Sequence, residues 1–250
     1  MADEELSGRR IAMWSGPRNI STALMRSFGS RSDTFVTDEP LYSYYLKETG
    51  LEHPLASKIV STYESKLANV VETLLGPTPD GSRVWYQKHM SHHILPTTSL
   101  DWLDGFTHAF LVREPRAMLS SLCKKLGIVT LDETGLPQQV ELYRMMAERS
   151  DEPPPVVDAR EIQLDPRGVL EELCRRLDLE FEEAMLTWEA GPRDTDGCWG
   201  PLWYENTYAS TSFQPYREKP IEIPEAMEGV AVRAEDLYAE LVEYAIRAKS

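Results

Sequence analysis

Five short apolar runs constrain the fold of this chain more than any other feature of its sequence. They lie at residues 11–14, 34–37, 84–88, 108–112 and 156–159. Each has the length of a buried strand. Segments with helical periodicity separate them, at residues 21–28, 55–75 and 116–126. This alternation is typical of an α/β fold with a mostly parallel central sheet flanked by helices, and such sheets bind ligands beyond the carboxyl ends of their strands.

Composition narrows the class of protein. A chain of 250 residues suits a single domain, which we take to span residues 1–250. The net charge of −15 argues against a nucleic-acid partner or an acidic membrane surface, so an anionic ligand needs a local pocket. No apolar run approaches 18 residues and no secretion signal is evident at the start, so we expect a cytoplasmic protein without a membrane span. Cys123, Cys174 and Cys198 fit neither a disulfide framework nor a metal knuckle.

Two further segments predict helices. Asp165 and Pro166 have the residue types of an N-cap and a first helical position, so they predict the start of a helix in "LDPRGVLEELCRRLDL". Near the end of the chain, "AEDLYAELVEYAIRAK" places Leu237, Leu241 and Tyr244 on one face, together with Ala248. That spacing predicts an amphipathic helix docked on the domain.

The turn after the first apolar run, "SGPRNIST" at residues 15–22, is a candidate anion site. A turn that leads from a strand into a helix directs backbone N–H groups and a helix N-terminus at one point, which favours an anion there. The triphosphate pattern G-x-x-x-x-G-K-[ST] requires a lysine that this turn lacks; its one cation is Arg18, and Ser21 and Thr22 follow. An ordinary turn with Ser21 or Thr22 as the helix cap remains the alternative.

A second candidate anion site lies in "FLVREPRAMLSSL", residues 110–122. Arg113 follows the fourth apolar run, and Ser121 lies about two helical turns further on. Both side chains can therefore face the crevice that holds the first turn. The alternative is that Arg113 pairs with Glu114 or another acid, and that Ser120 and Ser121 lie on a helix surface.

Four segments in this order resemble the sulfotransferases that use 3′-phosphoadenosine 5′-phosphosulfate (PAPS), a family with a P-loop-like α/β fold. "SGPRNISTALM" resembles their 5′-phosphosulfate loop, and "VREPRAMLSS" resembles their 3′-phosphate element, an arginine followed eight residues later by a serine. "VTDEPLY" and "LDPRGVLEELCRRLDLEF" resemble the Glu-Pro-Leu segment and the late helix of carbohydrate-type and bacterial members. The resemblance covers about residues 10–190. It implies a cofactor-binding set of Gly16, Pro17, Arg18, Asn19, Ile20, Ser21, Thr22, Arg113 and Ser121.

This resemblance implies transfer of a sulfuryl group from PAPS to a hydroxyl or amine of a small acceptor, without a required metal. Arg18 would stabilise charge on the leaving oxygen. Asn19 and Ile20 stand where the family has a Ser-Gly pair. The nearest likeness is to a branch sometimes labelled branched-chain aminotransferase-like, but a pyridoxal-phosphate enzyme needs a Schiff-base lysine and a different fold.

Two residues are candidates for the base that deprotonates the acceptor. Glu39 lies in "TDEPLY" and matches the carbohydrate-type enzymes, whereas His89 lies in "QKHMSHHILP", which resembles the Lys-Thr-His-Leu-Pro segment of the cytosolic enzymes. Histidine has the better unperturbed pKa for this work. Lys88 is a candidate for neutralising charge beside Arg18. A zinc site made by His89 and its neighbours His92 and His93 is a further alternative, although a fourth ligand is not evident.

The aromatic-rich segment at 190–220 predicts either a lid over a small acceptor or a loop bound to the core. Two other functions remain open. One is a P-loop kinase or nucleotide hydrolase, and the other is a catalytically silent protein that binds a nucleotide or a partner. The sequence indicates neither the identity of the acceptor nor the oligomeric state.

Overall fold

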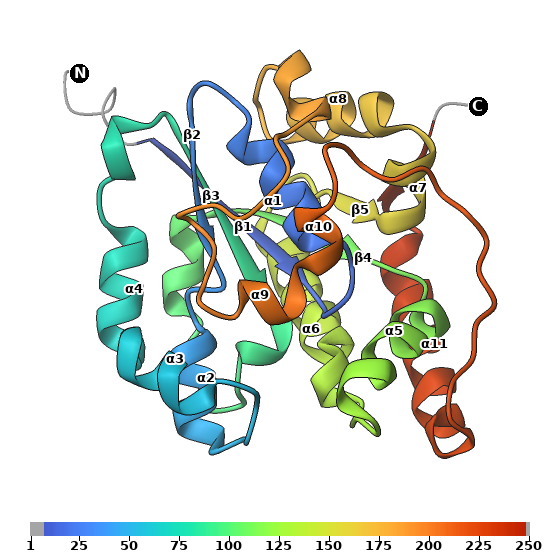
Figure 1. The fold of residues 1–250 in the computed structure, drawn as a ribbon. Helices are drawn as coiled ribbons and strands as arrows, with labels where there is room; N and C mark the ends of the chain where they lie inside the picture. Colours follow the sequence, from blue (N-terminus) through green and yellow to red (C-terminus); the bar gives the residue numbers. More distant parts are fainter. Residues whose placement is uncertain (1–7, 249–250) are drawn as a thin grey trace.

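A single sheet of six strands organises the molecule, which was obtained as a computed structural model and is described over residues 8–248 (Figure 1). The strands are β1 (Arg9–Ser15), β2 (Thr34–Asp38), β3 (Val84–Met90), β4 (Thr107–Val112), β5 (Val156–Asp158) and β6 (Ala245–Ile246). Their order is β2-β3-β1-β4-β5-β6, and all neighbours run parallel. The predicted α/β fold with a mostly parallel sheet flanked by helices is confirmed.

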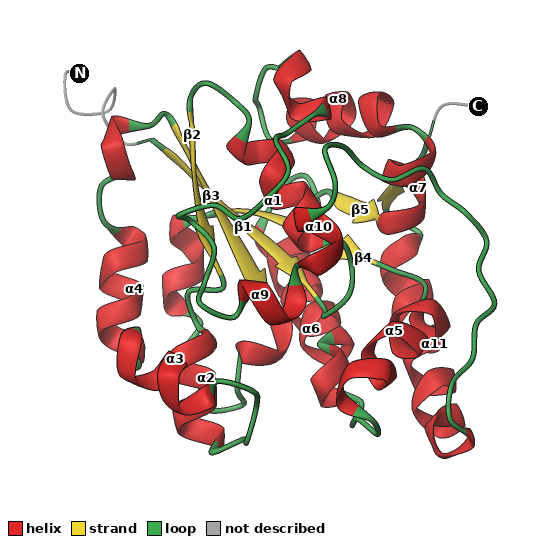
Figure 2. Ribbon diagram, in the orientation of Figure 1, coloured by secondary structure: helices red, strands yellow, loops and turns green. Residues whose placement is uncertain are grey.

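Helices cover both faces of this sheet (Figure 2). They are α1 (Ser21–Gly29), α2 (Tyr42–Thr49), α3 (Ala56–Thr62), α4 (Leu67–Leu75), α5 (Pro115–Leu126), α6 (Leu136–Arg149), α7 (Ala159–Leu164), α8 (Pro166–Arg176), α9 (Gly200–Trp203), α10 (Glu205–Tyr208) and α11 (Glu228–Val242). Helices α1, α7 and α8 pack on one face of the sheet, and α4, α6 and α11 pack on the other. The central strands are therefore buried on both faces, which explains why they appear as continuous apolar runs.

The five predicted strands correspond to β1–β5, but two predicted helices differ from the structure. The helix expected over residues 55–75 is divided into α3 and α4, because Tyr63 is extended and the Glu64 carboxylate accepts hydrogen bonds from the N–H groups of Ser65 and Lys66, both at 2.8 Å. The last predicted helix ends at Val242. The chain then forms β6, which pairs with β5.

The start of α8 agrees with the sequence. Asp165 accepts a hydrogen bond from the Gly168 N–H at 2.9 Å, and Pro166 is the first residue of the helix. A carboxylate at this position satisfies one of the N–H groups that a helix leaves without an intrahelical partner.

The register of the sheet determines which residues meet at its carboxyl edge. Ser15 of β1 lies beside Met90 of β3 and Leu111 of β4, and Asp38 of β2 lies beside Lys88 of β3. The chain segments that follow β1, β2, β3 and β4 therefore leave the sheet along one edge. The helices α9 and α10 lie over this edge (Figure 1). None of the helices in residues 8–248 is long and apolar enough to span a membrane.

Candidate active site

A cavity of about 1190 Å³ lies at the carboxyl edge of the sheet. Its walls include the turn after β1, the ends of β2 and β3, helix α5, and the segment from Trp203 to Ile221. The cavity therefore contains both candidate anion sites and reaches the acidic turn after β2. The arrangement agrees with the general position of ligand sites in parallel α/β sheets.

The turn after β1 has an unusual backbone conformation. Arg18 and Ile20 have φ values of 62° and 61°, in the left-handed region that a β-branched residue such as Ile20 rarely adopts. Gly16 packs closely against the rest of the protein, since a Cβ atom at this position would lie 2.4 Å from the Thr134 carbonyl oxygen. Strained backbone of this kind persists where surrounding structure enforces it, often at functional sites.

The side chain of Asn19 supports this turn from within. It is 2% exposed, and its amide can donate to the Pro17 carbonyl oxygen at 3.1 Å while accepting from the Gly16 N–H at 3.3 Å. Asn19 thus supplies internal hydrogen bonds, whereas Ile20 takes the left-handed conformation for which glycine is best suited.

The turn leads directly into the N-terminus of α1. The Leu24 N–H donates to the Ile20 carbonyl at 3.1 Å, so the N–H groups of residues 21–23 precede the intrahelical ladder. Ile20 provides no side-chain cap. Neither Ser21 nor Thr22 is the cap, in contrast to the ordinary-turn alternative, and both side chains line the cavity. The start of α1 is therefore suited to an anion.

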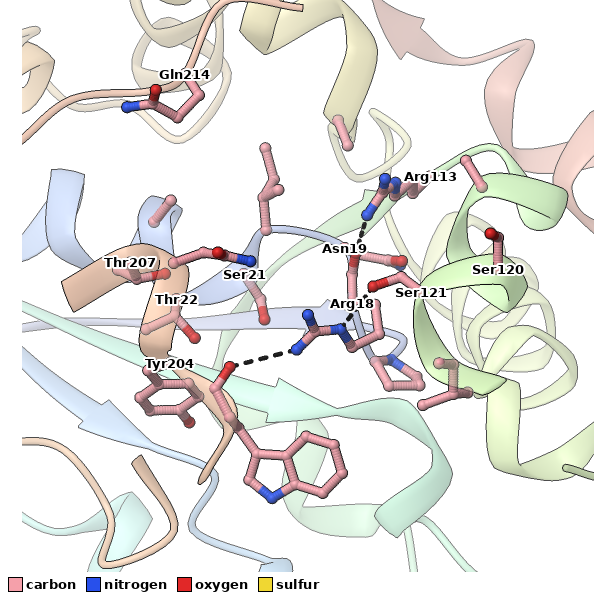
Figure 3. Close-up of a pocket in the computed structure, with 18 of the residues that line it drawn as sticks. Arg18, Asn19, Ser21, Thr22, Arg113, Ser120, Ser121, Tyr204, Thr207 and Gln214 are labelled. Atoms are coloured by element: carbon pink, nitrogen blue, oxygen red, sulfur yellow. Dashed lines mark hydrogen bonds between the residues drawn. The ribbon is translucent and has the colours of Figure 1, made fainter. Parts of the chain in front are cut away.

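Arg18, Arg113 and Ser121 meet in the cavity (Figure 3). Arg18 Nε donates to Ser121 Oγ at 3.0 Å, and its NH1 atom donates to the Trp203 carbonyl at 3.3 Å. The Arg113 NH1 atom donates to the Arg18 carbonyl at 2.6 Å. The residues of the two candidate anion sites are thus adjacent in one cavity.

Arg18 and Arg113 form no ion pair with a carboxylate of the described residues. Among the ion pairs within residues 8–248, none includes Arg18 or Arg113. Glu114, the acid next to Arg113, instead caps α5 by accepting from the N–H groups of Arg116 and Ala117 at 2.9 and 2.7 Å. Burial lowers the pKa of both guanidinium groups, and the charge of Arg18 lowers that of Arg113 further.

At the other end of the cavity, Lys88 is completely surrounded by partners. Its Nζ atom donates to Asp38 Oδ1 at 2.7 Å, to Glu39 Oε1 at 2.5 Å and to Tyr204 Oη at 2.8 Å. The side chain is 1% exposed. Burial lowers its pKa, but attraction to the two carboxylates outweighs this and raises the pKa overall. Because an ammonium has three donors, this geometry differs from the expected role of Lys88 beside Arg18: no donor is left for a leaving oxygen.

Tyr204, which follows α9, connects this helix to the cluster of Lys88, Asp38 and Glu39. Its Oη atom lies 2.8 and 2.9 Å from the two oxygens of Asp38 and 3.2 Å from Glu39 Oε1, and it accepts from Trp199 Nε1 at 2.8 Å. Asp38 Oδ2 also accepts from the Gly197 N–H at 3.0 Å. Both oxygens of Asp38 are therefore occupied, and the carboxylate serves to hold residues 197–204 over the sheet.

Glu39 is the carboxylate with unused hydrogen-bonding capacity. It lines the cavity, its side chain is 11% exposed, and its contacts with Lys88 and Tyr204 both use Oε1. Its φ value of 44° lies in the left-handed region. Burial, followed by repulsion from Asp38, raises its pKa against the opposing attraction of Lys88. A carboxylate with a raised pKa beside a cavity is suited to accept a proton.

His89 lies outside this cavity, in contrast to the sequence expectation. Neighbouring strand residues point to opposite faces of a sheet, so Lys88 reaches the cavity and His89 points to the other face. There it stacks on Trp14 with ring centroids 4.6 Å apart and contacts Gln87 Oε1 through Nε2 at 3.2 Å. Burial lowers its pKa to about 3. Its position gives no support to the predicted role of base.

The histidines that do line the cavity are His53, His92 and His93. His93 stacks between Tyr42 and Tyr45, with centroid distances of 4.9 and 4.8 Å. Burial lowers the pKa of His92 to about 3 and that of His93 well below its usual value. No group of three metal-ligating side chains among residues 8–248 is placed to hold an ion, so the zinc alternative gains no geometric support.

Comparison with known proteins identifies the family. A model of the sulfotransferase domain matches residues 9–238. The chain belongs to the sulfotransferase domain family. The sulfotransferase domain of the Synechococcus PCC 7002 olefin synthase has a similar fold, with a TM-score of 0.59 and 20% identity over 93% of this chain and 95% of that one. The sulfotransferase domain from the curacin biosynthetic pathway gives a TM-score of 0.54 and 17% identity, covering 94% and 98% of the two chains.

Two proteins of Arabidopsis thaliana have sequences similar to this sulfotransferase domain. Branched-chain-amino-acid aminotransferase-like protein 2 is 37% identical over 86% of this chain and 38% of its own length. Branched-chain-amino-acid aminotransferase-like protein 1 is 36% identical over 95% of this chain and 42% of its own length. The chain thus spans about two fifths of these relatives. Their label is the one expected from the sequence.

Sequence reasoning did not predict the contacts of Asp38 and Tyr204 with Lys88 and Glu39. Asp38 precedes Glu39 at the end of a predicted strand, so a pair of adjacent acids was the available signal. Tyr204 lies in the aromatic-rich segment, 165 positions after Glu39 in the sequence. No local pattern indicates that contact.

Proposed function

We propose that this chain transfers a sulfuryl group from PAPS to a hydroxyl or amine of a small acceptor. The observation that carries the proposal is the pair Arg18 and Arg113. They line the cavity and form no ion pair with a carboxylate within residues 8–248, in a chain with a net charge of −15. Desolvating a cation without a partner is unfavourable. A site that nevertheless keeps two such cations side by side is suited to a ligand with several negative charges.

The residues present fit a nucleotide with phosphate groups at the 3′ and 5′ positions of its ribose. The turn of residues 16–22 and the start of α1 offer backbone N–H groups and a helix N-terminus to the 5′-phosphosulfate. Arg113, with Ser121 nearby, offers a planar donor group to the 3′-phosphate. Bound PAPS supplies the activated sulfuryl group, and these residues bind and orient it.

Arg18 belongs to the turn that binds the 5′-phosphosulfate, contacts Ser121 and Arg113, and has the most direct catalytic role in the proposal. Its side chain is held by Ser121 and by the Trp203 carbonyl, and its own carbonyl oxygen is held by Arg113. A guanidinium fixed in this way can stabilise negative charge that grows on the leaving oxygen without reorganising first.

Glu39 is the base in this proposal. Its raised pKa and its position beside the cavity allow it to take the proton that the acceptor loses. Lys88 and Tyr204 act through Glu39: they contact Oε1 and leave Oε2 for the acceptor, while Asp38 holds Lys88 and Tyr204 in place. We therefore assign Lys88 a positioning role.

The test compares nucleotides that differ by one group. Calorimetry should detect binding of 3′-phosphoadenosine 5′-phosphate, much weaker binding of adenosine 5′-phosphate, and no increase with magnesium. Transfer of ³⁵S from labelled PAPS should then be followed over a panel of alcohols and amines. Binding of the bisphosphate without any transfer would favour a catalytically silent nucleotide-binding protein. A folded sample that binds neither PAPS nor the bisphosphate would exclude the proposal.

A further inference from the structure

A second cavity of about 700 Å³ adjoins the acceptor end of the first. It lies between the end of α2, the segment that follows β3, and α6. Its apolar lining consists of Leu51, Ile94, Leu95, Pro96, Leu100, Pro137, Leu142 and Met145. A cavity of this size and composition is within the range that small ligands occupy.

The two cavities share one wall. Tyr45, His92 and Glu133 line both of them. Tyr45 and His92 also form an edge-to-face ring contact, with centroids 5.3 Å apart. A molecule whose reacting group lies near Glu39 can therefore extend past these three side chains into the second cavity.

Buried polar atoms at this junction lack protein partners. Both ring nitrogens of His93 are buried without a hydrogen bond, as is Nδ1 of His92. His93 is 1% exposed. A neutral imidazole carries one donor and one acceptor, and buried polar groups are rarely left unsatisfied. These nitrogens are enclosed by protein and do not face either cavity, whereas the apolar lining of the second cavity fits an apolar part of a ligand.

Charge around the second cavity narrows the class of ligand. Asp132, Glu133 and Glu141 line it, and the described lining contains no lysine or arginine. An anionic tail would therefore be repelled. Glu133 already accepts hydrogen bonds from the N–H and hydroxyl of Thr130, at 2.7 and 2.8 Å, and Asp132 and Glu141 are exposed. These contacts place the carboxylates at a solvated rim around an apolar interior.

We propose that the acceptor is an alcohol carried on a neutral aliphatic chain, and that this chain occupies the second cavity. The inference rests on the proposed function, since it takes the cavity beside Glu39 as the acceptor site. It adds the class of acceptor: an elongated, uncharged molecule rather than a compact polar one.

The test measures how affinity depends on chain length. The full chain, with and without 3′-phosphoadenosine 5′-phosphate, is titrated with 1-butanol, 1-hexanol, 1-octanol and 1-decanol in a calorimeter. We expect Kd to fall about fourfold for each added methylene, because burying one is worth about 0.8 kcal/mol. A Kd that does not change with chain length would overturn the inference. Tighter binding of 8-amino-1-octanol than of 1-octanol would also overturn it, because the cavity would then select a cation.

Two substitutions locate the effect. Met145→Trp places a larger side chain in the cavity and should abolish the gain in affinity beyond 1-hexanol. Leu100→Trp, on another part of the lining, is the second variant if the first does not fold. Leu164→Trp is the matched control, because Leu164 is 49% exposed and lies outside both cavities. The same dependence on chain length in a folded Met145→Trp or Leu100→Trp protein would contradict the assignment.

A separate readout distinguishes this inference from the proposed function. Length-dependent binding without ³⁵S transfer to any alcohol would count against the sulfotransfer proposal and leave the aliphatic site intact. Transfer to alcohols with kcat/KM independent of chain length would support sulfotransfer and exclude the aliphatic site.

Discussion

The two ends of the main cavity differ in whether their cationic side chains have carboxylate partners. At the end formed by the β1 turn and α5, Arg18 and Arg113 lie side by side without a carboxylate. At the end formed by β2 and β3, Lys88 is enclosed by two carboxylates and a tyrosine hydroxyl. Unmatched cations leave the first end ready for an anion. Excess carboxylate leaves the second end ready to accept a proton.

This difference shows why the type of residue alone does not determine its role. Lys88 and Arg18 are both cations in one cavity, but the donors of Lys88 are used within the protein. Among the residues that the structure describes, the donors of Arg18 reach a hydroxyl and a carbonyl but no carboxylate, so its charge is not neutralised there. The partners of a charged group therefore indicate whether it serves the fold or a ligand. Five predictions test this contrast.

The largest effect is expected at Glu39. Glu39→Gln should lower kcat by about 10² to 10⁴, the usual contribution of a general base. In the unchanged protein, activity should fall as the pH drops through the pKa of Glu39, which burial raises above the usual glutamate value. In a pH profile of ³⁵S transfer, this fall in activity at low pH (the acid limb) should be absent from the variant. His89→Gln is the control and should keep both the rate and the pH profile. If His89→Gln loses activity and Glu39→Gln does not, His89 is the base.

Removing the enclosed cation should destabilise the fold. Lys88→Met leaves two buried carboxylates without their counter-ion, and we expect the free energy of unfolding to fall by about 3–5 kcal/mol. Arg113→Met is the matched comparison: it removes an unpaired cation and one hydrogen bond, and should change stability by no more than about 1 kcal/mol. Urea denaturation measures both. Equal losses in the two variants would contradict the contrast between the ends of the cavity.

Arg18 should affect rate more than binding. Arg18→Ala is expected to lower the single-turnover rate with bound PAPS by about two to three decades, or roughly 3 to 4 kcal/mol, with a smaller loss of affinity for the bisphosphate product. Arg18→Lys should recover part of the rate because it keeps the charge but not the planar donor group. An unchanged rate in Arg18→Ala would reduce Arg18 to a structural part of the turn.

A moderate effect is expected on the 3′-phosphate. Arg113→Ala should weaken binding of 3′-phosphoadenosine 5′-phosphate by about 10- to 100-fold, since a hydrogen bond to a charged group is worth about 1.5–3 kcal/mol. Ser121→Ala should weaken binding of this nucleotide by a smaller factor. Calorimetry with adenosine 5′-phosphate provides the control, because that nucleotide lacks the 3′-phosphate. If Arg113→Ala weakens both nucleotides equally, the assigned contact is wrong.

The smallest effect is expected at Tyr204. Its hydroxyl lowers the pKa of Glu39, so Tyr204→Phe should raise that pKa and move the acid limb of the activity profile to higher pH. One hydrogen bond of about 1 kcal/mol corresponds to a shift below about one pH unit. Loss of packing alone would lower kcat without moving the limb. A limb that stays in place would therefore exclude the proposed link between Tyr204 and Glu39.

Sequence reasoning was most successful where the signal was local. Apolar runs gave the strands β1–β5, and the residue types at Asp165 and Pro166 gave the start of α8. It failed where other hydrogen bonds interrupt a helical pattern. The helix expected over residues 55–75 breaks at Tyr63, and the last helix ends at Val242 so that β6 can pair with β5.

The sequence by itself determined strands β1–β5, the start of α8 and the positions of Arg18, Arg113 and Glu39 after strands, because each depends on neighbours within a few residues. Only the tertiary structure decided which side chains share a cavity. It separated Lys88 from His89, since adjacent residues of a strand face opposite ways. It also brought Tyr204 to Asp38 across 166 positions and left Arg18 and Arg113 without a carboxylate. Such contacts arise from chain segments that meet only after folding, so no local pattern records them.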